Sequence, residues 1–376
     1  MEFFNQTVES INSSLNFTTS STEIYLSILT PIVVSLLMIV AVIGNSVALA
    51  IIYRSRALHE PPGILLANLA FADLLIGFCV MPSSLIYGLW PSTISSISNQ
   101  TNPFQDNLCQ GIGYVTSLSF GMVYCTIAYI TFDRSIAVFK PFTYSTLVTS
   151  RRAIIIISTS WIILALISAI PLFGLQAYAL GKYQYVGYFS SCWLDLSNFY
   201  ENGIYVLGTF FALLAILLYV VINYICLLLR ARKAYHQIMD SSIARRRHHR
   251  LQKSTKTVTV VIGTFLIFSI PSVYISLATA LQHRYVGSPL ICRLFSLWAM
   301  YTNVAINPFI FGLSHHTFKE SYFRLIADIQ RGYFCHHCKL IKSHRRVRIH
   351  PTMIAPRNKY SKQSFTFETT ATLTTG

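Results

Sequence analysis

The chain has 376 residues, of which 53% are apolar and only 11% carry a charge, and its mean hydropathy is +0.52. A soluble globular domain is usually about 25% charged, so much of this chain is expected to lie away from water. Eight cysteines in this length argue against a disulfide-dense scaffold, and the net charge of +16 raises the question of nucleic-acid binding.

The first long run without a charged residue extends from Ile24 to Tyr53. At 1.5 Å per residue, a helix of this length crosses a hydrocarbon core of about 30 Å. Because a bilayer tolerates only helices and closed barrels, and each run is too long for a strand, we expect an all-α membrane protein with seven transmembrane helices. The six further apolar runs lie at 62–90, 109–139, 152–176, 202–229, 257–281 and 290–313.

The lysines and arginines are distributed unevenly along these runs. Residues 1–25 contain none, and only Lys182, Arg284 and Arg293 fall in loops on the same side of the bundle. The positive-inside rule therefore predicts a multi-pass membrane protein with its N-terminus outside and its tail in the cytosol. The basic excess becomes a topology signal with anionic lipids as a further partner, and nucleic-acid binding is not expected.

Further marks agree with this orientation. Four glycosylation acceptors lie on the predicted outside, at Asn5, Asn12, Asn16 and Asn99. Cys109 opens the third span, and Cys192 lies between the fourth and fifth spans. Both face the oxidising compartment, where a disulfide persists, whereas Cys292 has no obvious partner.

Several polar side chains interrupt the apolar runs. Asp73 lies in the middle of the second span, where a charged group costs about 2.5–3.5 kcal/mol, so we expect it to be paired or functional inside the bundle. The alternative for such groups is hydrogen bonding between helices. Further amides at this depth are Asn45, Asn68, Asn303 and Asn307.

Three prolines, Pro171, Pro271 and Pro308, lie within the fourth, sixth and seventh runs. Each lacks a backbone donor and is expected to kink its helix, although membrane helices tolerate proline.

Together, these residues resemble the rhodopsin-like class of G-protein-coupled receptors over residues 25–330. The motifs are "GNSVALA", "LANLAFADLL", "FDRS", Trp161, "FSIP" and "NPFIF", in that order and at suitable spacing. Within this class, "KPFTYSTLVTSRRA" and the pair Trp298 and Tyr301 loosely resemble the amine receptors. The resemblance implies a plasma-membrane receptor that transmits an extracellular signal to a heterotrimeric G protein, and not an enzyme.

In such receptors the arginine matching Arg134 is held by the acid matching Asp133 until the sixth span swings out and a G protein binds. A partner that binds only the open state shifts the population toward it. The alternative is an ion pair that merely anchors the helix end. The resemblance implies a switch made of Asp133, Arg134, Tyr224, Phe265, Pro271, Asn307 and Pro308.

The chain departs from the family pattern at several switch positions. Ser135, Ser269 and Phe311 replace a tyrosine, a tryptophan and a tyrosine, and Ile216 replaces a proline in the fifth span. Leu251 lies where many relatives carry an acid that faces the arginine. The resting lock is therefore expected to be weak and basal signalling to be high.

The family's ligand pocket opens outward between the third, fifth, sixth and seventh spans. Thr116 replaces the aspartate that binds amines, and Tyr301 replaces the lysine that binds retinal, so a neutral small molecule is favoured and a retinal cofactor is not expected. A peptide ligand that reaches Lys182, Asp195 and Glu201 remains open. By alignment the lining is Thr116, Ser117, Phe120, Ser269, Ser272, Ser276, Trp298 and Tyr301, although core packing explains each residue equally well.

The family also commonly binds a sodium ion beside the aspartate of the second span. Here Asp73, Ser119, Asn303 and Asn307 offer oxygens, but Val123 lies where a serine often contributes. Sodium is thus an option, and no other metal is expected.

The predicted domains are a glycosylated N-terminus at 1–24, a receptor domain at 25–313, a short amphipathic eighth helix at 314–334 and a disordered tail at 335–376. Cys335 and Cys338 flank two histidines too closely to wrap one tetrahedral zinc ion, which favours palmitoylation. Serines and threonines in the tail suit receptor kinases and arrestin.

Two other readings remain. A receptor-like protein that signals without a ligand is compatible with the substituted switch. An ion-translocating seven-helix protein is the least favoured, because only Asp73 and the terminal Asp133 could form a relay of acids.

Overall fold

The computed structural model describes residues 2–89, 103–186, 191–195, 198–237, 260–278, 290–314 and 318–327. Nearly all of them belong to one unit, Met1–Leu325. This part holds seven helices that are long and apolar enough to cross a membrane, which confirms the predicted bundle. The spans are Ile28–Arg54, Pro61–Ile86, Asp106–Phe139, Ser150–Phe173, Phe199–Arg230, Val260–Ala278 and Ile291–Gly312.

The first helix, α1, extends from Glu2 to Arg54 and begins well before the expected apolar run. A short 3₁₀ turn, Arg56–Leu58, connects it to α2 (Pro61–Leu75). Pro61 occupies the first turn of α2, where the missing N–H has no helical partner to lose.

The second span is not one regular helix. A π-helical turn, Ile76–Val80, separates α2 from α3 (Met81–Leu89). Pro82 lies two residues after this turn, and its ring and missing N–H disfavour a regular bond to the preceding turn. The sequence analysis did not anticipate this break, although Pro82 was its signal.

The third span belongs to α5 (Pro103–Phe139), and the fourth begins with α7 (Ser150–Ala169), after the single-turn α6 (Tyr144–Leu147). A 3₁₀ turn, Ile170–Phe173, closes the fourth span. Pro171 lies in that turn, so it ends the helix and does not kink it, contrary to the expectation.

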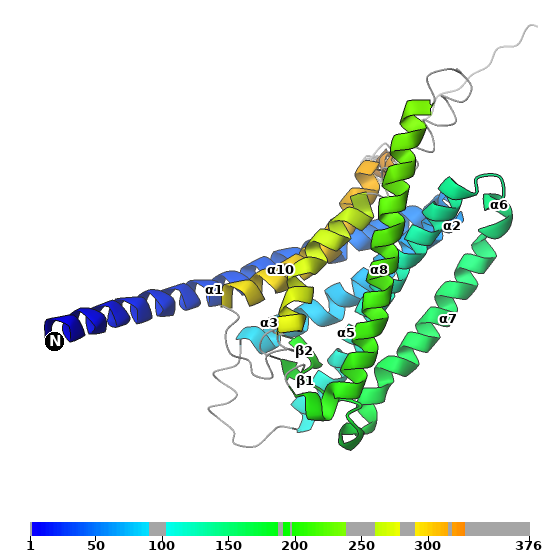
Figure 1. Cartoon of the computed structure of the whole chain (residues 1–376). Coiled ribbons are helices and arrows are strands. Elements are labelled where there is room, and N and C mark those ends of the chain that lie inside the picture. The colour runs from blue at the N-terminus through cyan, green and yellow to red at the C-terminus, as the bar shows by residue number, and fades with distance from the viewer. Residues whose placement is uncertain are drawn as a thin grey trace, which may run out of the picture. The chain divides into compact units, whose positions relative to one another are not determined.

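Two short strands follow the 3₁₀ turn Gln176–Tyr178. Strands β1 (Tyr183–Val186) and β2 (Ser191–Leu194) pair antiparallel. We call this pair the hairpin, and it lies at the same end of the bundle as α3 (Figure 1). Helix α8 (Phe199–Gln237) carries the fifth span.

The remaining spans are the helix Val260–Ala278, which contains Pro271, and α10 (Leu290–Ser314), which contains Pro308. Residues 318–327 are helical and lie inside the predicted eighth helix, whose other residues are mostly outside the described part.

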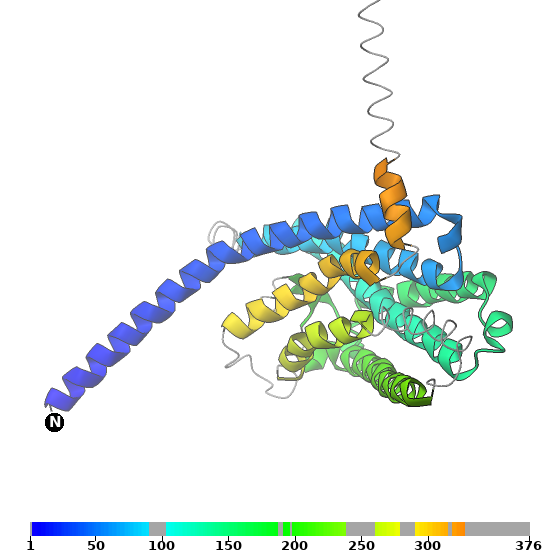
Figure 2. The same ribbon diagram turned by 90° about the horizontal axis from the view of Figure 1, so that it is seen from above.

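The first and last spans lie side by side (Figure 2). Asn45 joins them, because its Nδ2 donates to the carbonyl oxygen of Val304 at 3.3 Å and to that of Ala41 at 2.9 Å. A Cβ on Gly44 would lie 3.0 Å from Cγ of Pro308, so glycine permits this close approach. Asn45 therefore has a structural task between helices.

Asn68 connects three spans in the same way. Its Nδ2 donates to Oγ1 of Thr126 at 2.7 Å, and its Oδ1 accepts from Nε1 of Trp161 at 2.8 Å. The alternative of helix-to-helix hydrogen bonding thus accounts for Asn68. The hydrogen bond to Asn68 also gives a structural role to Trp161, one of the residues that carry the family resemblance.

Large apolar side chains cover the outward faces of the spans. On α7, Ile154, Ile155, Ile162 and Leu166 are each at least half exposed. Contiguous apolar surface on this scale is unfavourable in water and suits a lipid environment.

Candidate functional site

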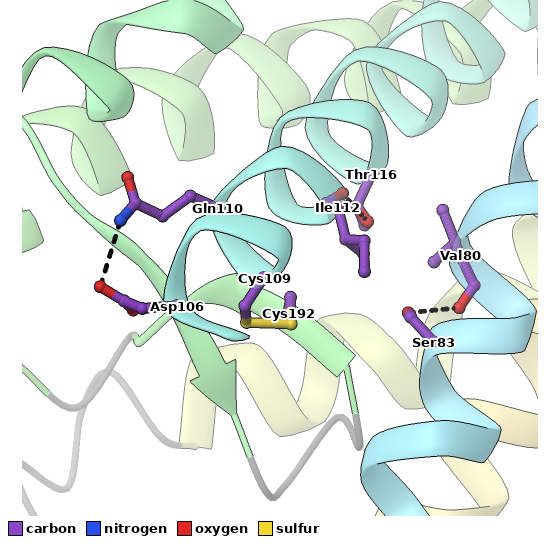
Figure 3. Close-up of a disulfide and its surroundings, with 8 residues drawn as sticks. All are labelled: Val80, Ser83, Asp106, Cys109, Gln110, Ile112, Thr116 and Cys192. Carbon is purple, nitrogen blue, oxygen red and sulfur yellow. Dashed lines mark hydrogen bonds between the residues drawn. A yellow bond between two sulfur atoms is a disulfide. The ribbon is translucent and has the colours of Figure 1, made fainter. Parts of the chain in front are cut away.

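A disulfide anchors the hairpin to the third span. Cys109 near the start of α5 and Cys192 on β2 have their sulfurs 2.05 Å apart and their Cα atoms 5.3 Å apart (Figure 3). This confirms the disulfide expected from the sequence. It fixes one end of α5, which we call the hairpin end of the bundle.

Both faces of the hairpin pack against other parts of the bundle. Tyr183 pairs with Leu194, and Gln184 pairs with Trp193. Because side chains alternate along a strand, Tyr183 and Leu194 share one face and Trp193 lies on the other.

Tyr183 is fully buried against the third, fourth and fifth spans. Its hydroxyl donates to the carbonyl oxygen of Ser168 at 2.9 Å. A Cβ on Gly113 would lie 2.5 Å from Cγ of this ring, so only glycine fits there. Burial raises the pKa of the Tyr183 phenol, which keeps the hydroxyl protonated as a donor.

The opposite face of the hairpin meets the third and sixth spans. The Trp193 ring lies edge-on to that of Phe120, with 5.9 Å between centroids, and Val186 packs with Ile275. The hairpin therefore lies among the helices predicted to enclose the ligand. The sequence analysis missed Trp193, and its place directly after Cys192 was the available signal.

The lining residues expected on the third span lie at the hairpin end of α5. Thr116 is buried and donates to the carbonyl oxygen of Ile112 at 2.7 Å (Figure 3). Ser117 accepts from Oγ of Ser168 at 3.2 Å and lies 3.5 Å from the Tyr205 hydroxyl. Ser117 is thus engaged by the fourth and fifth spans, whereas Phe120 meets the hairpin.

The lining residues expected on the sixth and seventh spans are divided between local and interhelical contacts. Ser269 and Ser276 donate to carbonyls in their own helix, at 2.7 and 2.8 Å. Ser272 accepts from Ser296 at 3.1 Å and so connects the sixth span with α10. The Tyr301 hydroxyl meets that of Ser84 in the second span at 2.5 Å.

Trp298, the remaining lining residue, is partly buried, and its Nε1 has no hydrogen-bond partner among the described residues. A donor at this position could serve a ligand that carries an acceptor.

Midway along the bundle, Asp73 is fully buried and accepts from Nδ2 of Asn307 at 2.8 Å. Its second oxygen, Oγ of Ser119 and Oδ1 of Asn303 are buried without a hydrogen-bond partner in the described part of the chain. A carboxylate with neutral oxygens is the donor set that a hard cation prefers, so these residues fit a sodium ion.

At the other end of α5, which we call the Arg134 end, Asp133 and Arg134 form an ion pair. Nη2 of Arg134 lies 2.8 Å from Oδ2 of Asp133, and both side chains are about 90% buried or more. The Tyr144 hydroxyl donates to Oδ1 of Asp133 at 2.7 Å. Burial and the neighbouring Asp133 raise the pKa of Tyr144, which keeps the phenol protonated. The sequence analysis missed Tyr144.

Two further contacts adjoin the switch residues. Ser135 donates to Oδ1 of Asn223 in the fifth span at 3.0 Å, so this serine gives its position a polar contact between spans. Phe265 is buried, and its ring lies edge-on to that of Tyr124, with 5.2 Å between centroids. Tyr224 and Ile216 both pack against the main core, and Phe311 is fully buried in it.

Comparison with known proteins decides the family. Residues 44–311 match the model of the 7 transmembrane receptor (rhodopsin family). The chain belongs to the rhodopsin family of seven-transmembrane receptors. It is therefore a multi-pass membrane protein, and the family signals through G proteins, commonly in response to small molecules.

Individual relatives carry amine names. The chain is 28% identical over 361 residues to 5-hydroxytryptamine receptor 2 of Aplysia californica, and the aligned part covers 83% of this chain and 79% of the relative. It is 27% identical over 287 residues to trace amine-associated receptor 5 of Homo sapiens, covering 76% and 80%. It is 23% identical over 342 residues to octopamine receptor beta-2R of Chilo suppressalis, covering 82% and 80%.

Several expected modification sites are not part of the described structure. The side chains of Asn5, Asn12 and Asn16, all of Asn99, and Cys335 and Cys338 lie outside the described residues, as does Leu251. Within the described part, no group of three His, Cys, Asp or Glu residues could hold a metal ion.

Proposed function

We propose that this chain is a plasma-membrane receptor that binds a small molecule at the hairpin end and activates a heterotrimeric G protein at the Arg134 end. The carrying observation is the buried pair Asp133–Arg134. Buried ion pairs are costly to desolvate, and stability alone is a weak reason to keep one. A pair that separates when a partner binds has a functional reason to be retained despite this desolvation cost.

The geometry of α5 supports this assignment. Cys109 and Arg134 are 25 residues apart on one helix, about 37 Å along its axis, so the two sites lie on opposite sides of a bilayer core.

The Arg134 end also offers a surface for a partner. Phe142 is 84% exposed, so most of its surface is accessible to a partner. It borders an open cleft of about 610 Å³, lined by Phe139, Lys140, Pro141, Phe142, Thr143, Thr146 and Leu147. We assign this surface to the G protein.

We infer that the ligand is neutral or weakly polar, although the relatives carry amine names. A protonated amine needs a fixed counter-charge, and Thr116 offers a hydroxyl that already donates to its own helix. Hydroxyls on Ser272 and Tyr301 and the donor of Trp298 suit neutral acceptors and donors. The sodium ion, where bound at Asp73, Ser119, Asn303 and Asn307, supplies charge neutralisation in the resting bundle.

The orientation proposed from the basic residues places the N-terminus outside, with Asn5, Asn12, Asn16 and Asn99 glycosylated there. Cys335 and Cys338 are then cytosolic and available for palmitoylation, and the tail is available to receptor kinases and arrestin. An N-terminal epitope tag tests this on intact cells. Antibody staining without permeabilisation is expected, and staining only after permeabilisation would refute the orientation.

The decisive test of function is a panel of neutral and amine ligands, read by G-protein dissociation in cells that express the chain. Arg134→Ala provides the blank, with Arg151→Ala as the matched control, because Arg151 is an exposed arginine on the same side of the bundle. We expect a response that Arg134→Ala removes and Arg151→Ala retains. A coupling that survives Arg134→Ala would refute the proposal.

The same assay without ligand tests the ligand-independent alternative. The substituted Ser135 and Ser269 favour high basal signalling, whereas the added hydrogen bond from Tyr144 holds Asp133 in place. A basal signal well above that of Arg134→Ala would support constitutive activity, and equality with the blank would oppose it.

A further inference from the structure

The sixth span lacks the tryptophan that the resemblance led us to expect, since Ser269 occupies that position. The structure holds a tryptophan elsewhere in the same region. Trp193 reaches the bundle from β2 and packs against the main core through Phe120.

From Trp193, aromatic rings continue into the bundle. Phe120 and Tyr124 are four residues apart on α5 and therefore lie on one face of that helix, one turn from each other. Tyr124 then meets Phe265 of the sixth span, with centroids 5.2 Å apart and the rings at 81°. Two ring contacts and a shared face of α5 thus place four aromatic side chains in series between the hairpin and Phe265 of the sixth span.

The hairpin that carries Trp193 is firmly held. Besides the disulfide and Tyr183, Asn202 on α8 accepts from the backbone N–H of Lys182 at 2.9 Å and donates to the carbonyl oxygen of Asp195 at 3.0 Å. Asn202 is 1% exposed. Trp193 is only partly buried and lies among the helices of the proposed ligand site, so a ligand there would meet this ring.

We propose that Trp193 is the residue through which the ligand site acts on the sixth span, by way of Phe120, Tyr124 and Phe265. A loop residue thereby performs the task for which Ser269 has no ring. The inference rests on the proposed function for its biological meaning. Packed aromatic contacts have few alternative arrangements, so a displaced Trp193 changes which rotamers of Phe120 and Tyr124 fit beside Phe265.

The test reads the position of the sixth span directly. An environment-sensitive fluorophore is attached to cysteine in Val260→Cys, near the start of the described sixth span, where 38% of the side chain is exposed. The full chain is purified in nanodiscs after reactive native cysteines other than Cys109 and Cys192 have been replaced by serine. No ligand or G protein is needed, and Phe265→Ala serves as the positive control.

We expect Trp193→Ala and Phe120→Ala to shift the emission maximum in the same direction as Phe265→Ala. The double variant Trp193→Ala/Phe120→Ala is expected to shift the emission maximum no further than Phe120→Ala alone, because Trp193 acts through Phe120. Trp193→Phe should leave the emission spectrum close to the parental one. Tyr178→Ala should leave it unchanged, because Tyr178 is an exposed aromatic residue of the same loop.

An unchanged spectrum in Trp193→Ala beside a shifted one in Phe265→Ala would overturn the inference, as would additive shifts in the double variant. The unfolding midpoint is measured for each variant, so that a shift caused by general unfolding is recognised and counted against it. If Trp193→Ala shifts the spectrum while the parental chain activates no G protein, the proposed function fails and the inference stands.

Discussion

The two ends of α5 are held in different ways. At the hairpin end, a covalent bond between Cys109 and Cys192 and the fully buried Tyr183 fix the loop to the helices. At the Arg134 end, the contacts are non-covalent: an ion pair joins Asp133 to Arg134, and a hydrogen bond joins Tyr144 to Asp133. The first set opens only with large losses, whereas the second can exchange for contacts with water or a partner.

This difference indicates where the molecule can change. A fixed hairpin end offers a constant frame for the proposed ligand, and an Arg134 end held by non-covalent contacts can move when its alternative contacts become favourable. The predictions below break the covalent end first and then release single contacts at the other end.

The largest effect is expected from Cys192→Ala, which removes the disulfide. A cross-link over 83 residues restricts the unfolded chain, and its loss typically costs about 2–5 kcal/mol. We expect a marked fall in the unfolding midpoint in detergent and poor surface expression. Cys226→Ala is the matched control, because Cys226 is an exposed free cysteine on α8. Its free energy of unfolding should stay within about 0.5 kcal/mol of the parental value. Equal midpoints for the two variants would contradict the prediction.

Gly113→Ala is expected to loosen the hairpin without breaking the disulfide. The new Cβ would lie 2.5–2.6 Å from the Tyr183 ring, and such overpacking costs about 1–3 kcal/mol. Gly111→Ala is the control, because nothing lies within 4 Å of its Cβ position and the helix gains about 0.5–1 kcal/mol. Thermal unfolding of both variants should therefore shift in opposite directions. If both variants are stabilised, the close approach of Tyr183 is wrong.

The sequence alone predicted the frame of this comparison. Seven long apolar runs specify seven spans because lipid excludes unpaired backbone, and Cys109 and Cys192 lie on one side by topology alone. Asp133 and Arg134 are neighbours in the chain, so their pairing needed no fold. These features depend on local sequence or on the membrane.

The missed features depend on contacts between distant residues. Trp193 meets Phe120 across 73 positions, and Tyr144 reaches Asp133 only after the chain turns between two spans. The strands that carry Trp193 have four residues each, too few for a clear alternating pattern. Pro171 was predicted to kink its helix, yet it lies in the turn that ends the helix. Pro82, which the sequence analysis did not use, follows a π-helical turn.

At the Arg134 end, Tyr144→Phe should release Asp133 from one partner. A hydrogen bond to a charged group contributes about 1.5–3 kcal/mol, and part of this is recovered from water in a half-exposed loop. We expect basal G-protein dissociation to rise several-fold. Ser145→Ala, at an exposed neighbouring position, should leave it unchanged. Lower basal activity in Tyr144→Phe would mean that this phenol supports the active state instead.

The smallest effect is expected from Ser135→Ala, which removes the contact between the third and fifth spans. The hydroxyl lies 3.0 Å from Oδ1 of Asn223 but also 2.9 Å from the carbonyl oxygen of Thr131, so either acceptor can receive its single proton. A neutral hydrogen bond contributes about 0.5–1.5 kcal/mol, and the alternative acceptor places the loss near the lower value. Ser135→Thr, which keeps the hydroxyl, is the control. A double-mutant cycle with Asn223→Ala, read by unfolding midpoint and by basal signalling, isolates the pair. Coupling in the basal signal, with little change in the midpoint, would place this contact in the switch, whereas coupling in the midpoint alone would make it a structural contact between helices.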